Sequence, residues 1–87
     1  MEIQVNKDMC FLCGCRSTDT HHIFNGNGLR KKSDEDGLVV YLCRNCHNRV
    51  HTDYAIRHAL KQLGQGWYEN NLGSREEFIK RYRKNYL

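Results

Sequence analysis

The chain has 87 residues and a formal net charge of +4, from 14 Lys and Arg against 10 Asp and Glu. This length favours one domain over residues 1–87, and no apolar run approaches the 18 residues that a membrane span needs. The mild positive charge fits a polyanionic partner without requiring one. A domain this small usually needs a disulfide or a bound metal ion for stability, and its five cysteines are candidates for that role.

The first half of the chain predicts two strands joined by a loop. Residues 18–24 are expected to form a short strand that carries His21 and His22. The glycine-rich turn at 25–28 opens a polar loop through 29–37. Residues 38–42, Leu-Val-Val-Tyr-Leu, follow Gly37 and are typical of a second strand.

The second half predicts helices. An apolar period of helical spacing runs from about residue 46 to 63, and Gly64-Gln65-Gly66 is expected to end that helix. Ser74 and Glu77 form a capping box that predicts a further helix start. The order strand, loop, strand, helix and helical tail places the chain in the α+β class, with a core at about 8–63 and a tail at about 67–87.

Two Cys-x2-Cys pairs predict a structural zinc site. Each two-residue gap folds as a tight knuckle that aims both sulfurs at one point, so four thiolates complete a closed tetrahedral site. Free buried cysteines or disulfides are the alternative reading. Cys15 is a further thiol that competes with Cys13, although the spacing favours Cys13. The four expected zinc ligands are Cys10, Cys13, Cys43 and Cys46.

Four histidines form a second candidate cluster. His47 and His51 are four residues apart on the predicted helix, so both rings lie on one face and can chelate one ion. His21 and His22 are neighbours in a strand and point to opposite sides, so one can bind the ion while the other faces a substrate. His58 lies further along the helix and is expected to be a surface residue outside this cluster.

These motifs together resemble one known family. The succession Cys10-x2-Cys13, His21-His22-Ile23 and Cys43-x2-Cys46-His47-Asn48-x2-His51 is similar to the His-Asn-His (HNH, or ββα-metal) endonucleases. The loop 22–26, together with residues 75–80 and 85–87 at the end of the chain, looks like small nucleases of phages and prophages. The resemblance implies a ββα-metal core stapled by zinc, with an appended C-terminal helical tail.

The resemblance also implies roles for the histidines. His21, His47 and His51 would hold a catalytic divalent cation. His22 would be the general base that activates water to hydrolyse DNA phosphodiester bonds. Imidazole ligands favour Mn²⁺, Ni²⁺, Co²⁺ or Zn²⁺, with Mg²⁺ also admitted. Implied partners are DNA and phage packaging or recombination proteins.

One position departs from the family pattern. Many members have an Asn five residues before the first cysteine of the second pair, where it tethers the loop and orients the base. This sequence has Leu38 there. Asn25, Asn27 and Asn48 are the candidates to replace that Asn, and the sequence does not choose among them.

Basic residues near the motifs are candidate phosphate contacts, which would position a duplex without reading its sequence. The alternative is a solvated surface, balanced in the loop by neighbouring acidic residues. The candidates are Arg30, Lys31, Lys32, Arg44 and Arg49.

Two other functions compete with the nuclease. One is a non-catalytic zinc-knuckle module that binds nucleic acid or protein, with a variant in which His47 and His51 join Cys43 and Cys46 around one zinc. The other is a phage accessory protein that works within a partner complex. The first residues are polar and lack the apolar core of a signal peptide, so we expect a cytoplasmic protein. If a phage encodes it, we expect it in the cytoplasm of the bacterial host.

Overall fold

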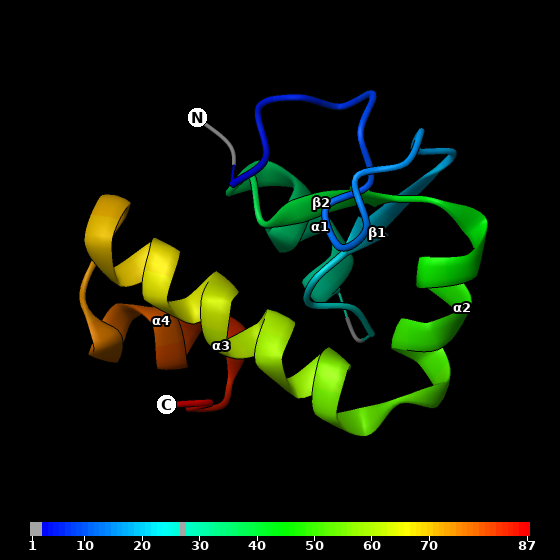
Figure 1. Ribbon diagram of the computed structural model, residues 1–87. Coiled ribbons are helices and arrows are strands. Elements are labelled where there is room, and N and C mark those ends of the chain that lie inside the picture. Colours follow the sequence, from blue (N-terminus) through cyan, green and yellow to red (C-terminus); the bar gives the residue numbers. More distant parts are fainter. Residues whose placement is uncertain (1–2, 27) are drawn as a thin grey trace.

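A computed structural model of the protein describes residues 3–26 and 28–87 (Figure 1). It confirms a small α+β fold with a two-stranded sheet and helices packed around it. The elements in chain order are β1 (Asp19–His22), α1 (Leu29–Glu35), β2 (Val39–Leu42), α2 (Arg44–Thr52), α3 (Tyr54–Asn71) and α4 (Arg75–Tyr82).

The two strands pair in antiparallel register, with His21 opposite Val40 and His22 opposite Val39. The first strand, Asp19–His22, is shorter than the predicted 18–24. The Ile23 amide still donates to the Leu38 carbonyl, and Ile23 and Phe24 then lie in the core, where each is 1% exposed. The second strand closely matches its prediction. The sheet therefore presents the histidine pair at the end of β1, immediately before two core residues.

The prediction of a loop over residues 29–37 is wrong, because most of this segment forms helix α1. Its sequence, Leu-Arg-Lys-Lys-Ser-Asp-Glu, has no apolar period, and contacts to α4 stabilise it instead. Asp36, at its C-terminal end, accepts hydrogen bonds from Arg81 Nε and Tyr82 Oη, each of 2.6 Å. Lys32 Nζ donates to the Arg81 carbonyl. The order is therefore strand, helix, strand, helix.

The single helix predicted from 46 to 63 is also wrong, since two helices cover this region and the second continues past it. The Asp53 carboxylate accepts from the amides of Ala55 and Ile56 and so begins α3 separately from α2. Gly64-Gln65-Gly66 does not end α3. A Cβ at Gly64 would lie 3.0 Å from Phe24 Cε2, so this glycine permits the helix to approach the segment after β1. The helix also crosses the expected boundary between core and tail.

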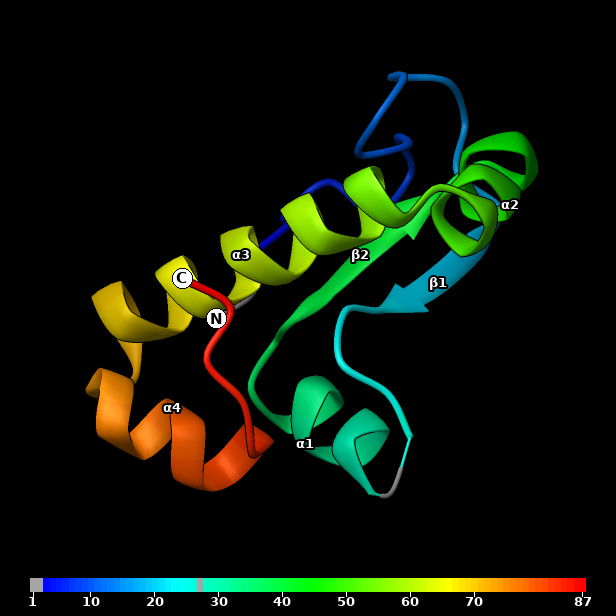
Figure 2. The same ribbon diagram turned by 90° about the horizontal axis from the view of Figure 1, so that it is seen from below.

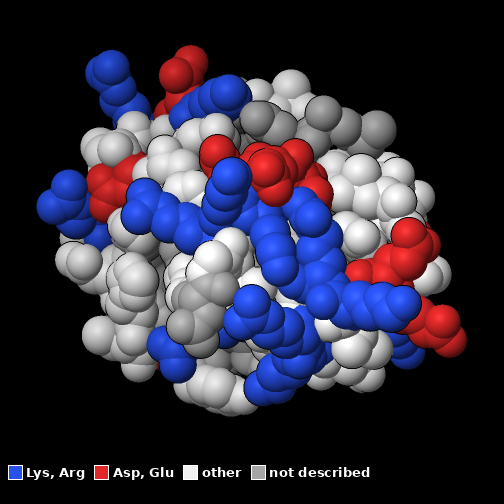
Figure 3. Space-filling model, turned by 180° about the vertical axis from the view of Figure 1, so that it is seen from behind, with Lys and Arg blue, Asp and Glu red and all other residues white. Residues whose placement is uncertain are grey.

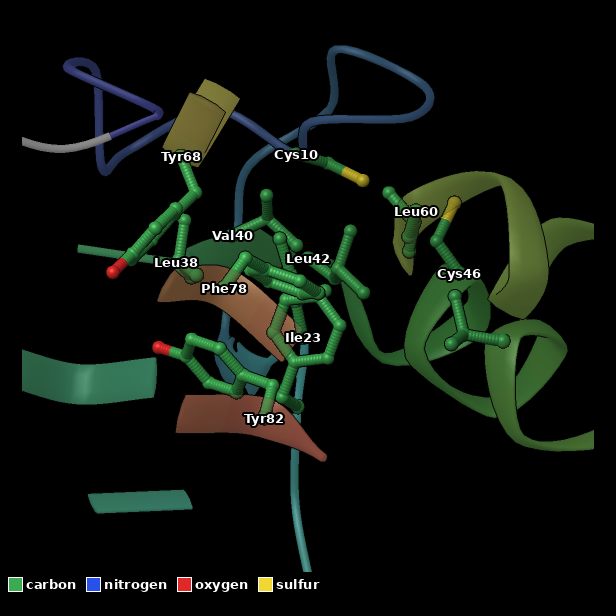
Figure 4. Close-up of a cluster of buried hydrophobic side chains, with 12 residues drawn as sticks. Cys10, Ile23, Leu38, Val40, Leu42, Cys46, Leu60, Tyr68, Phe78 and Tyr82 are labelled. Carbon is green, nitrogen blue, oxygen red and sulfur yellow. The ribbon is translucent and has the colours of Figure 1, made fainter. Parts of the chain in front are cut away.

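Helix α4 folds back against α3 (Figure 2). Its capping box is confirmed, with Ser74 and Glu77 each bonded to the other's backbone amide. Phe78 and Tyr82 are buried and pack their rings on Phe24, at centroid distances of 5.4 and 4.7 Å. Figure 4 shows this apolar cluster extending to Cys10 and Cys46 at one edge. The tail thus belongs to the same core as the histidine-bearing strand.

Within the described residues, no helix combines the length and apolar character that crossing a bilayer requires.

Candidate metal centres

The four predicted cysteine ligands lie together, with their sulfur atoms all within 4.8 Å of one another. The Sγ atoms of Cys13 and Cys43 are 3.6 Å apart. Four sulfurs placed tetrahedrally at about 2.3 Å from one zinc ion would be about 3.8 Å apart. The cluster therefore has the donor atoms and nearly the spacing of a four-cysteine site, and could hold a metal such as zinc.

Backbone hydrogen bonds set the two cysteine knuckles. In the first, the Gly14 amide donates to the Cys10 carbonyl, and Gly14 has a positive φ of 80° that suits a glycine. The Phe11 amide donates to Tyr41 and ties this knuckle to β2. In the second, Cys43 caps α2 and its sulfur accepts from the Cys46 amide at 3.4 Å. The cysteines thus join the N-terminal loop, β2 and the start of α2.

The cluster favours a thiolate at Cys10. Burial raises the pKa of this thiol. Hydrogen bonds from the backbone at Cys43, Cys13 and Leu12 together have the larger, opposite effect and bring the pKa down to about 6. Burial raises the pKa of the Cys46 thiol. A bound cation would favour the thiolate at all four positions, as metal ligation requires. Cys15 is exposed and is not among the clustered cysteines.

The three predicted histidine ligands form a second cluster. Ring nitrogens of His21, His47 and His51 lie within 4.8 Å of one another, and the Nε2 atoms of His47 and His51 are 3.2 Å apart. Two nitrogens bound tetrahedrally at about 2.0–2.1 Å from one ion would be about 3.3–3.4 Å apart. The chemistry and spacing of these donors therefore fit a metal ion.

Asp19 orients His47, a role that the sequence analysis did not predict. Its Oδ2 accepts from His47 Nδ1 at 2.8 Å, which places the proton of a neutral ring on Nδ1 and leaves the Nε2 lone pair facing His51. The bonds from His47 and then Arg44 lower the pKa of Asp19 to about 2. Asp19 precedes His21 by two residues in β1, so both side chains project from one face of the strand. That spacing was an available signal.

His21 is the buried member of the cluster, at 4% exposure. Burial, followed by the nearby charges of His47 and His51, lowers its pKa to about 4. The ring is therefore neutral at pH 7, which is the form that binds a metal.

His22 borders a cavity of about 220 Å³ beside this cluster. The cavity is lined by Thr20, His21, His22, Asn25, Arg30, His47 and His51. His22 Nε2 lies 3.4 Å from Asp34 Oδ1, a second carboxylate that sequence reasoning missed, because the residue was assigned to a solvated loop. The cavity thus joins the candidate ligands, the candidate base and one arginine.

Ser33 links the segment that follows the histidine pair to the residue that precedes β2. Its buried hydroxyl donates to the Leu38 carbonyl at 2.5 Å and lies 3.4 Å from the Phe24 amide. Leu38 itself is buried in the core. Of the Asn candidates, Asn25 lines the cavity and Asn48 is exposed on α2, while Asn27 lies outside the described residues.

The predicted phosphate contacts fall into two groups. Arg30 lines the cavity, Lys31 borders an adjoining hollow that His22 also lines, and Arg49 is exposed on α2. Lys32 and Arg44 instead make the structural contacts to Arg81 and Asp19. Lys and Arg side chains gather over the face opposite the view of Figure 1, next to a smaller acidic group (Figure 3).

The chain is a small α+β protein with a four-cysteine cluster that could hold a metal and a separate three-histidine cluster. Over residues 3–84 the chain matches the family described as "Protein of unknown function (DUF968)", and it belongs to that family. It is 32% identical over 79 residues to "Uncharacterized protein YdfU" of Escherichia coli strain K12. This match covers 90% of the chain but 20% of that relative, so the chain spans about a fifth of its length. No solved structure matches the chain.

Proposed function

We propose that this domain is a metal-dependent endonuclease of the HNH type, which hydrolyses phosphodiester bonds in DNA. The observation that carries the proposal is the convergence of three imidazoles on one point, with a fourth, His22, in the same cavity. In this proposal the four-cysteine cluster would bind a structural zinc ion that stabilises the fold, and the three-histidine cluster would bind a second, catalytic ion.

His22 acts as the general base in this proposal. The Asp34 carboxylate beside Nε2 favours the tautomer with its proton there, which leaves Nδ1 to take a proton from the attacking water. General-base catalysis typically contributes about 10²–10⁴-fold. A divalent cation held by His21, His47 and His51 would supply stabilisation of the charge that develops on the phosphate and leaving oxygen.

Other residues position these groups. Asp19 directs His47 toward the cation, and Ser33 ties the chain after His22 to the start of β2, the region where many HNH enzymes use an Asn. Arg30 in the cavity wall, with Lys31 beside it, would contact phosphate oxygens.

The test is cleavage of supercoiled plasmid by the purified wild-type protein with Mg²⁺, Mn²⁺ or Ni²⁺ and without added cation. Nicking or linearisation that requires an added ion supports the proposal. His47→Ala should abolish it, while Asn45→Ala, an exposed change in the same helix, should not. Absence of cleavage with every ion would contradict the nuclease function and favour the non-catalytic zinc-knuckle module.

A further inference from the structure

A strip of aromatic and basic side chains adjoins the histidine cluster. Tyr54, Arg57, His58 and Lys61 are spaced i, i+3, i+4 and i+7 in α3, so they share one helix face. Two residues of the C-terminal segment lie against that face. The aromatic–basic strip is defined as Tyr54, Arg57, His58, Lys61, Lys84 and Tyr86.

The rings of the strip form a row. Tyr54 and His58 stack with centroids 5.6 Å apart and planes only 13° from parallel, and Tyr86 lies 6.3 Å beyond His58. Tyr54, at one end of the row, is 66% exposed. A large aromatic ring this exposed and already stacked on one side contributes little to the core. It does offer surface for a further planar group.

Three cations flank these rings. Arg57 lies over Tyr54 at 5.6 Å, and Lys61 and Lys84 lie over Tyr86 at 5.5 and 5.2 Å from the ring centroid. Burial, and then the charges of Arg57 and Lys84, lower the pKa of Lys61. Among residues 3–26 and 28–87, none of the three cations is ion-paired with a carboxylate. An anion bound there would relieve their repulsion.

The strip is continuous with the candidate active site. Arg57 Nη1 donates to the His51 carbonyl at 3.0 Å, which places the start of the strip at the end of the helix that carries two ligands. A polymer bound along the strip would therefore lead directly to the histidine cluster.

We propose that the aromatic–basic strip binds an unpaired nucleic-acid strand, with a base stacked on the exposed ring of Tyr54 and phosphates beside the three cations. Stacking of this kind needs a free base face, which an unpaired strand offers and a regular duplex does not. The inference deepens the proposed function, on which it rests for the claim that the bound strand belongs to a substrate. It predicts that a substrate with an unpaired segment binds more tightly than a regular duplex.

The test is fluorescence anisotropy with labelled oligothymidylate, the same strand in a duplex, and oligouridylate. It uses the full chain carrying His22→Ala, with zinc retained, so that binding is measured apart from cleavage. We expect tighter binding of a single strand than of the duplex, and the DNA and RNA arms identify which strand is preferred. Tyr54→Ala should weaken single-strand binding about 5- to 10-fold, and Tyr54→Phe should restore it.

Lys84→Ala should weaken binding and reduce its salt dependence. Arg75→Ala removes the same charge at the start of α4, where Arg75 pairs with Glu69 away from the strip, and should leave single-strand binding unchanged. Equal or tighter duplex binding, or unchanged single-strand binding in Tyr54→Ala, would overturn the inference even if the wild type cuts plasmid. Single-strand preference that depends on Tyr54, in a protein that cuts nothing, would uphold this binding site and refute the nuclease.

Discussion

The carboxylate of Asp19 accepts a hydrogen bond of 2.8 Å from Nδ1 of His47, and this contact determines which nitrogen of His47 faces the other two histidines. Asp19 comes from β1, the strand that also supplies His21. One short strand therefore contributes a candidate ligand directly and orients another ligand through a carboxylate. The same carboxylate accepts from Arg44 at 2.9 Å, which holds it at the start of α2.

Asp19→Ala should weaken binding of a divalent cation at the three-histidine cluster by about 10- to 100-fold, because His47 loses the partner that fixes its tautomer and ring orientation. Calorimetric titration with Mn²⁺ or Ni²⁺ measures this effect, and the zinc content should stay unchanged. Glu76→Ala, which removes an exposed carboxylate from α4, is the matched control. Equal affinity in wild type and Asp19→Ala would show that Asp19 does not orient a ligand.

Cys43→Ser should lose the structural zinc and unfold or strongly destabilise the domain, because the Cys43 sulfur caps α2 and its cluster joins that helix to the N-terminal loop. Binding of structural zinc supplies on the order of 10 kcal/mol in small domains. Metal analysis and thermal unfolding measure both effects. Cys15→Ser is the control and should retain zinc and stability, since Cys15 is exposed outside the cluster. A stable Cys43→Ser protein with full zinc would refute the four-cysteine site.

Gly64→Ala should destabilise the protein by about 1–3 kcal/mol, because the added methyl group would press on Phe24 and Ile23. Gly66→Ala meets no atom within 4 Å and should be neutral or stabilising by up to about 1 kcal/mol, as expected for alanine in a helix. Chemical denaturation of the two variants measures the contrast. Similar free energies of unfolding for both would contradict the close approach of α3 to this segment.

In protein without added divalent cation, the His21 ring should titrate near pH 4, because burial lowers its pKa to about that value. In the unfolded chain the pKa of a histidine is about 6.5, so between about pH 4 and about pH 6.5 the unfolded state binds more protons than the folded state. Proton uptake at His21 in the unfolded chain therefore lowers the free energy of unfolding as pH falls from about 6.5 to about 4. Histidine ring signals in an NMR titration measure it, and a His21 midpoint near 6.5 would show that the ring is not buried.

The sequence predicted the features that depend on local spacing. The two-residue gaps of the cysteine pairs and the four-residue gap from His47 to His51 fix how those side chains converge, and the structure brings both sets together. The Ser74 capping box is equally local. These patterns could be interpreted without knowledge of the tertiary fold.

The features that were missed depend on tertiary contacts. Helix α1 has almost no apolar period, and its bonds to Arg81 and Tyr82 come from residues more than forty positions away. Gly64 was interpreted from its low helix propensity, whereas its position against Phe24 favours a glycine inside the helix. Asp34 lies in α1, which was predicted as a loop, so its position beside the candidate base His22 was not predicted either.

In the proposed mechanism, His22 activates water for cleavage of DNA at the three-histidine cluster. The most direct measurement compares plasmid cleavage by wild type and His22→Ala with Mn²⁺, after both proteins are shown to retain zinc, Mn²⁺ affinity and folding. We expect the wild type to nick or linearise the plasmid and His22→Ala to leave it supercoiled. Cleavage by His22→Ala at a rate near that of the wild type would show that His22 is not the general base.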